Sequence, residues 1–207
     1  AIFQEPMTSL NPLHTIEKQI NEIIMLHSSL TYSDASIKTT NLLNEVGLQE
    51  ISKRLRSYPH ELSGGQRQRI MIAMSIANNP DLLIADEPTT ALDVTVQLQI
   101  INLLKNIQKK MSMSILFISH DLSVVKKIAD YICIMKDGII VENNSKEKIF
   151  ENPQHNYTKE LISAQTKKKI FSNHLSSSVL KVQNLKVWYP IKKGILRRII
   201  GYVKAVD

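Results

Sequence analysis

The sequence has few of the residues that cross-link or sharply bend a chain. Among 207 residues there are six glycines and one cysteine, Cys133, so no internal disulfide can form. The longest apolar runs fall far short of the roughly 20 residues that a transmembrane helix needs. The first residues show no charged region followed by a long apolar one, so we expect no secretory signal. We expect a cytosolic protein in which Cys133 is a buried, small hydrophobic residue.

A motif that binds nucleotide phosphates is also missing. The glycines lie at positions 47, 64, 65, 138, 194 and 201, and none is followed by lysine. The pattern G-x-x-x-x-G-K-[ST] therefore does not occur. In proteins that have it, this loop cradles the phosphates and supplies a lysine to them. The sequence therefore lacks this kind of phosphate-binding loop.

Positive charge is concentrated towards one end of the chain. The sequence has 26 basic and 19 acidic residues, a net charge of +7. Residues 1–158 contain 15 Lys+Arg and 17 Asp+Glu, a net −2, whereas residues 159–207 contain 11 and 2, a net +9. A groove for nucleic acid would place the excess on the folded body, so we expect no nucleic-acid partner.

The most informative stretch runs from Tyr58 to Asp93, YPHELSGGQRQRIMIAMSIANNPDLLIADEPTTALD. Its Leu62-Ser63-Gly64-Gly65-Gln66 segment precedes apolar residues at helical spacing, namely Ile70, Ala73, Met74 and Ala77. Glycines let a ligand approach the backbone N–H groups, and a helix N-terminus is electropositive. The turn therefore favours an anion such as phosphate, with an ordinary loop-to-helix turn as the alternative.

Further along the same stretch, the apolar run 82–85 lies between two prolines and predicts a strand buried on both faces, as in a parallel sheet. The strand ends in Asp86 and Glu87, at the edge where α/β sheets bind ligands. Asp86 can hold Mg²⁺, usually through water, and Glu87 can orient or deprotonate an attacking water. The alternative is that the two carboxylates cap a helix.

The other segments fit an alternation of helices and strands. The run from Ser114 to Asp121 predicts another buried strand, with His120 at its carboxyl end. The pattern between Ile16 and Ser57 is helical, and Gly47 is placed as a C-terminal cap. The remaining predictions are a helix over 94–110, strands over 131–135 and 139–142 joined by a turn at Asp137-Gly138, and helices over 146–150 and 157–164.

In this order the motifs resemble those of an ATP-binding cassette (ABC) ATPase. The segment from Leu62 to Gln66 matches the signature motif of that family, and 82–86 matches its Walker B strand. Glu87 matches the catalytic glutamate and His120 the switch histidine. The segment 91–93 matches the D-loop, and Gln4, which follows an apolar strand end, matches the glutamine of the Q-loop.

This resemblance implies ATP and Mg²⁺ as ligands. Gln4 and Asp86 would hold Mg²⁺, Glu87 would activate water, and His120 would steady the γ-phosphate. ATP on one cassette would be closed over by the signature motif of the opposite one. The implied ATP-binding residues are Gln4, Ser63, Gly64, Gly65, Gln66, Asp86, Asp93 and Tyr189, the last at the place of an adenine-stacking aromatic.

The resemblance extends to peptide importers. The segments MTSLNP (7–12) and ENPQHNYTKELISA (151–164) are similar to that subfamily, although Asn156 stands where its proline is typical. Residues 179–207 resemble the first edge of a second cassette in fused importers of the Yej type. A basic, amphipathic membrane hairpin is the alternative there. The implied partners are permease subunits, a second ABC cassette and, indirectly, an extracytoplasmic solute-binding protein, at the cytoplasmic side of the inner membrane.

We therefore expect an α/β fold, a partial P-loop NTPase-like ABC cassette with a parallel core sheet. Its ATPase domain would span 1–165 without a P-loop part, with a helical subdomain at about 12–57. A linker would cover 166–178, and a truncated second ABC domain would begin at 179. The expected function is that of a motor ATPase of a peptide or small-solute importer, present as a fragment. Because it lacks the P-loop, we expect the chain by itself to have little ATP affinity or turnover. The alternatives are a non-catalytic remnant of a split gene and a soluble ABC ATPase of nucleic-acid or translation processes.

Overall fold

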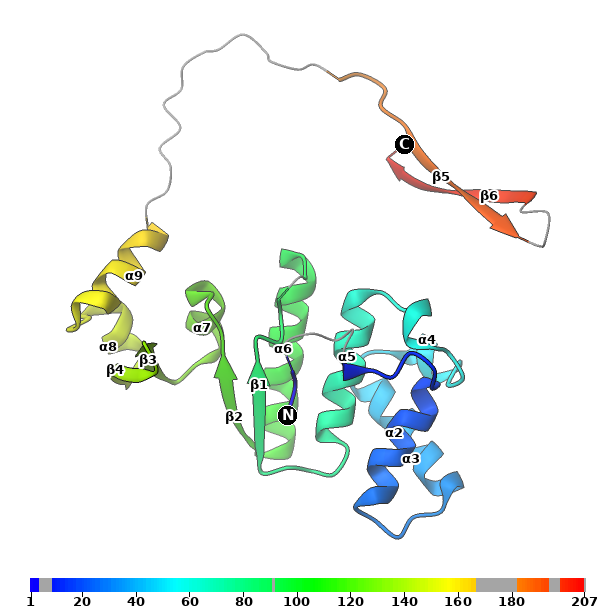
Figure 1. Cartoon of the computed structure of the whole chain (residues 1–207), viewed down its shortest axis with the longest axis horizontal. Helices are drawn as coiled ribbons and strands as arrows, with labels where there is room; N and C mark the ends of the chain where they lie inside the picture. Colours follow the sequence, from blue (N-terminus) through cyan, green and yellow to red (C-terminus); the bar gives the residue numbers. More distant parts are fainter. Residues whose placement is uncertain (4–8, 91, 167–181, 194–197, 207) are drawn as a thin grey trace. The chain divides into compact units, whose positions relative to one another are not determined.

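The computed structural model describes residues 1–3, 9–90, 92–166, 182–193 and 198–206, shown in Figure 1. They fall into two units, Ala1–Lys167 and Lys168–Asp207, which are considered separately below. Gln4 lies outside the described residues. Within them, no helix combines the length and the apolar character that crossing a bilayer requires.

A parallel pair of strands forms the centre of the first unit. β1 (Leu82–Asp86) pairs with β2 (Ser114–Ile118) in a register that sets Asp86 opposite Ile118. Ile2 makes a parallel bridge with Ala85 through hydrogen bonds of 2.8 and 3.0 Å, and so occupies the other edge of β1. The expected α/β class with a parallel sheet is confirmed.

The prediction that these strands are buried on both faces is wrong for the described structure. Leu83 and Ala85 are buried in the main core, together with residues from α2, α5 and α6. Leu82 and Ile84 are 52% and 39% exposed, and the apolar side chains of β2 alternate in the same way. Successive side chains of a strand point to opposite faces, and the described helices cover only one face.

Helices fill the segment before β1. They are α2 (Ile16–Leu26), α3 (Tyr32–Glu45), the short α4 (Gln49–Ser52), a 3₁₀ turn (Pro59–Glu61) and α5 (Gly64–Ile76). Thr15 and Thr31 cap α2 and α3 through their side chains. Gly47 has a φ of +77°, as predicted for a helix cap, because only a residue without Cβ adopts this conformation at little cost.

Arg69 ties these helices together. Its Nη1 donates to the carbonyl oxygen of Val46 at the end of α3 (2.7 Å), and its Nη2 donates to Oε1 of Gln99 (3.1 Å). Gln99 belongs to α6 (Val94–Met111), which connects β1 to β2. Burial lowers the pKa of Arg69. One side chain on α5 therefore links the helical segment to the helix that covers the sheet.

After β2 the chain forms α7 (Leu122–Ile128), a hairpin of β3 (Tyr131–Lys136) and β4 (Ile139–Ser145), α8 (Lys146–Glu151) and α9 (Asn156–Thr166). Asp137 and Gly138 have φ of +52° and +78°, as a type I′ hairpin turn requires. Cys133 is exposed, so its predicted burial is wrong. Ile132 and Ile134 face the small core around Ile149, and alternation turns Cys133 to the other side.

The described second unit is a hairpin of β5 (Val187–Lys193) and antiparallel β6 (Arg198–Val206). Residues 182–186 precede this hairpin and form no strand, and 179–181 lie outside the described residues. The centres of the Trp188 and Tyr202 rings are 6.0 Å apart, and the Lys204 amine lies 4.5 Å from the centre of the Trp188 ring. Tyr189 is 61% exposed.

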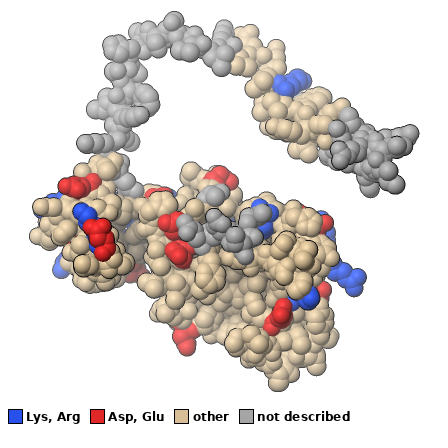
Figure 2. All heavy atoms as spheres, viewed as in Figure 1, with Lys and Arg blue, Asp and Glu red and all other residues tan. Residues whose placement is uncertain are grey.

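Charged side chains of both signs are interspersed over the first unit on the face that Figure 2 shows. The ion pairs of the first unit include that of Lys110 with Glu45, whose Nζ and Oε1 are 2.9 Å apart. On this face the basic residues do not form a continuous stripe of the kind that follows a nucleic-acid backbone.

Candidate functional site

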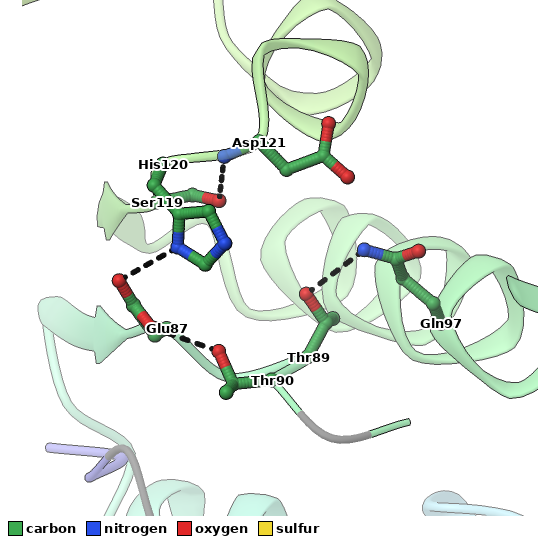
Figure 3. A network of polar contacts seen from close by, with 7 residues as sticks. All are labelled: Glu87, Thr89, Thr90, Gln97, Ser119, His120 and Asp121. Atoms are coloured by element: carbon green, nitrogen blue, oxygen red, sulfur yellow. Dashed lines mark hydrogen bonds and ion pairs between the residues drawn. The ribbon is translucent and has the colours of Figure 1, made fainter. Parts of the chain in front are cut away.

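The parallel register of the sheet brings Glu87 and His120 together. Each follows the carboxyl end of its strand, and Nδ1 of His120 lies 2.9 Å from Oε1 of Glu87 (Figure 3). The His120 side chain is 74% exposed and that of Glu87 is 21% exposed. These two predicted catalytic residues therefore form one acid–base pair at the edge of the sheet where α/β proteins bind ligands.

The backbone of Glu87 has an unusual conformation. Its φ is +44°, which costs a residue with a Cβ roughly 1–2 kcal/mol. Its N–H donates to the carbonyl oxygen of Ile118 (3.0 Å), and its own carbonyl oxygen accepts from the N–H of Thr90 (3.1 Å). These bonds hold the turn in place and direct the carboxylate towards His120. Strain of this kind is concentrated at functional sites.

This strain can be measured by comparing two variants that both lack the carboxylate. We expect Glu87→Gly to be more stable than Glu87→Ala by about 1 kcal/mol, because glycine tolerates positive φ. Urea unfolding of both variants measures the difference. The matched control is Asn102, exposed within α6, where the glycine variant should be the less stable one by about 1 kcal/mol. If the glycine variant were less stable than the alanine variant at both positions, the backbone strain assigned to Glu87 would be contradicted.

The pair also changes the protonation of the histidine. The hydrogen bond from His120 to Glu87 and the negative charge of that carboxylate raise the pKa of His120 above its ordinary value, outweighing a small effect of burial. The imidazolium form is therefore favoured while Glu87 is ionised. Since the ring is largely exposed, solvent screens part of this interaction.

A titration tests this pair. The pKa of His120 should lie above the ordinary value of about 6.5 and fall towards it in Glu87→Gln, as measured by NMR of the ring protons. The pKa of His120 is higher in the folded than in the unfolded state, so the pair contributes its full stabilisation at pH values below the unfolded-state pKa. This stabilisation is lost as the pH rises through the folded-state pKa. The stability difference between the chain and Glu87→Gln should shrink over that range. Identical His120 titrations would contradict the pairing.

Asp86 lies beside this pair as the last residue of β1. Its side chain is half-buried, and its N–H donates to the carbonyl oxygen of Ile2. The described residues contain no cluster of three potential metal ligands. Mg²⁺ usually takes one or two carboxylates and completes its shell with water and phosphate oxygens, so a single half-buried carboxylate at this edge fits it.

The signature turn, Ser63–Gln66, is the start of α5. The Ser63 Oγ accepts from the N–H of Gln66 (3.3 Å), and Oε1 of Gln66 accepts from the N–H of Ser63 (2.9 Å). This capping box occupies both polar side chains. The N–H groups of Gly64 and Gly65 are the other donors of the first turn, and they point along the axis at its electropositive end.

The same turn packs closely against the beginning of α6. A Cβ on Gly65 would lie 2.8 Å from Cγ1 of Val96, whereas one on Gly64 would lie 3.8 Å from Leu92. Asp93, the predicted D-loop residue, caps α6 because its Oδ1 accepts from the N–H groups of Thr95 and Val96 (3.0 Å each). The structure thus joins the signature turn to the D-loop side of α6 by direct packing.

This packing predicts different outcomes for the two glycines. Gly65→Ala should lower the free energy of unfolding by about 1–3 kcal/mol because the methyl group displaces Val96. The matched control Gly64→Ala should be close to neutral. Combining Gly65→Ala with Val96→Ala should restore part of the loss, which a double-mutant cycle in urea measures as a favourable coupling. Additive effects would show that the two side chains are not in contact.

Sequence reasoning did not find the threonine and the glutamine that surround the pair. Thr90 donates its hydroxyl to Oε2 of Glu87 (2.9 Å), and Nε2 of Gln97 donates to the hydroxyl of Thr89 (3.3 Å). Burial works to raise the pKa of Asp121, but hydrogen bonds from Ser123, Val124 and Gln97 outweigh it and lower the pKa. The only sequence signal was the spacing of Thr90 three residues after a carboxylate, which is typical of local turns.

Comparison with known proteins finds similarity to ABC transporter proteins. A sequence model described as "ABC transporter" matches residues 1–90. The chain is 56% identical over 207 residues, its whole length, to the peptidoglycan transport ATP-binding protein YejF of Agrobacterium fabrum (strain C58), of which it covers 38%. The chain is a homologue of ABC transporter ATP-binding proteins. The matched segment includes the signature turn, Asp86 and Glu87.

Two further relatives agree with this family. The chain is 48% identical over 202 residues to an uncharacterized ABC transporter ATP-binding protein YejF of Escherichia coli K12. The aligned region covers 97% of the chain and 38% of that protein. It is 42% identical over 233 residues to the glutathione import ATP-binding protein GsiA of E. coli K12. The aligned region covers the whole chain and 37% of that protein. The chain thus spans less than two-fifths of the length of these relatives, and its ABC-type fold class is confirmed.

Proposed function

We propose that the chain forms part of the ATP-hydrolysing motor of an ABC importer for peptides or related small solutes. The observation that carries this proposal is the Glu87–His120 pair at the carboxyl edge of a parallel sheet, with Asp86 next to it. A carboxylate paired with a histidine at this edge can accept a proton from a water and stabilise negative charge on a phosphoryl group.

Each residue has a role in this proposal. Glu87 orients the attacking water and accepts its proton. His120 uses Nδ1 to hold Glu87, which leaves Nε2 to meet the γ-phosphate. Asp86 and Gln4 would hold Mg²⁺, which neutralises charge on the β- and γ-phosphates when bound. Gln4 lies outside the described residues, so its role rests on the sequence motif.

The signature turn acts on a different nucleotide in this proposal. The backbone donors of Gly64 and Gly65, with Ser63 and Gln66, would close over ATP held by an opposite cassette, and Asp93 would lie at that interface. The electropositive end of α5 supports a phosphate ligand there. Tyr189, exposed on β5, would stack on the adenine bound by a second cassette.

The proposed partners are permease subunits and a second ABC cassette, with a solute-binding protein acting indirectly, at the cytoplasmic side of the inner membrane. The names of the relatives, which concern transport of peptidoglycan and import of glutathione, support a peptide-like cargo. A cavity of about 790 Å³ between the start of the chain, α2 and α5 supports a permease contact. Its lining includes Phe3, Ile23, Met71 and Met74.

An enzymatic complementation assay tests the proposal. Phosphate release should be near background for the 207-residue chain alone and should appear when a cassette fragment with the G-x-x-x-x-G-K-[ST] loop is added. Glu87→Gln should lower the rate about 10²-fold or more, because it removes the general base. MgATP titration of each component measures binding separately.

The controls separate the alternatives. Saturable micromolar MgATP binding by the chain alone would contradict the expected dependence on a P-loop. Equal rates for the chain and Glu87→Gln in the mixture would contradict the role of Glu87. No phosphate release from any mixture in which the fragments associate would favour a non-catalytic protein.

A further inference from the structure

The Glu87 carboxylate is held at both of its oxygen atoms. Oε1 pairs with His120 and Oε2 accepts from the hydroxyl of Thr90, at 2.9 Å in each case (Figure 3). The terminal torsion of a glutamate is broad, so a single hydrogen bond leaves the plane of the carboxylate free to turn. Two hydrogen bonds from different directions fix that plane.

The donor on Thr90 is itself well placed. Its N–H donates to the carbonyl oxygen of Glu87 (3.1 Å), which closes the turn that contains both residues. Threonine branches at Cβ, so its hydroxyl has few alternative positions. A turn closed by its own backbone and a stiff side chain together aim the hydroxyl at Oε2.

The neighbouring residue anchors this turn to α6. Thr89 is 6% exposed, and its hydroxyl accepts from Nε2 of Gln97 (3.3 Å). The Gln97 side chain also helps to lower the pKa of the Asp121 carboxylate, directly after His120. One glutamine on α6 therefore anchors the loop that carries Glu87, and Figure 3 shows its amide directed at the Thr89 hydroxyl.

We propose that Thr90 is a positioning residue that fixes the Glu87 carboxylate for proton transfer from water. The proposal rests on the proposed function of Glu87 as the general base. Thr90 does not touch the reacting atoms. It holds Oε2 so that Oε1 remains aligned with His120, and the carboxylate can then meet the water in a constant direction.

The structural part of this proposal is tested without any turnover. The His120 titration is recorded by NMR in the 207-residue chain and in Thr90→Val, Thr90→Ser and Glu87→Gln. Valine keeps the shape of threonine without its hydroxyl. We expect Thr90→Val to lower the pKa of His120 by at least half as much as Glu87→Gln does. Thr90→Ser should change that pKa little. A His120 titration in Thr90→Val that equals that of the unmodified chain overturns the proposal.

The catalytic part uses the mixture with a P-loop-bearing cassette fragment. We expect Thr90→Val to lower kcat about ten- to hundredfold with little change in KM for ATP, because a misaligned base affects the chemical step. Thr90→Ser should recover most of the rate. A fall in stability or a rise in KM that accounts for the whole loss overturns the positioning role.

The two measurements separate failure of this proposal from failure of the proposed function. If the unmodified mixture releases no phosphate while Thr90→Val still shifts the His120 titration, the catalytic function is wrong and the hydrogen-bond geometry is right. If the mixture is active and Thr90→Val changes neither the titration nor kcat, the proposed function holds and Thr90 has no positioning role.

Discussion

The parallel register between β1 and β2 is the constraint on which the site depends. Asp86 pairs with Ile118, and the ladder continues one residue further through the bond from the N–H of Glu87 to the carbonyl oxygen of Ile118. A slip by one residue would turn each side chain to the other face of the sheet. Glu87 and His120 would then no longer meet, and Asp86 would leave the edge that it shares with them.

A second constraint is the close approach of α5 and α6. Gly65 has a steric reason to be glycine, because any side chain would press on Val96, and this reason is independent of phosphate. The same contact joins the signature turn to Asp93, whose carboxylate caps α6. A motif that suggests ligand binding can therefore also be a packing requirement.

Particular residues show where sequence reasoning succeeded. The carboxylates and the histidine were each predicted at the carboxyl end of a strand, and Glu87 and His120 meet at one edge of the sheet. The type of most helices and strands in the first unit followed from periodicity and from turn residues such as Gly47 and Asp137, whereas α7 was not predicted. Burial was less predictable. Cys133 is exposed, and β1 has one exposed face, because a run of apolar letters does not say how many layers cover a strand.

The sequence by itself determined the order of motifs, the ends of the helices and the identity of the acid–base pair, since these depend on local spacing and on residue chemistry. Only the tertiary structure decided the positive φ of Glu87, the contact of Gly65 with Val96, and the part that Thr90 and Gln97 play around the pair. These features join residues from separate elements or depend on the exact direction of a turn. Such directions are set by the packing of helices on the sheet, which no local pattern encodes.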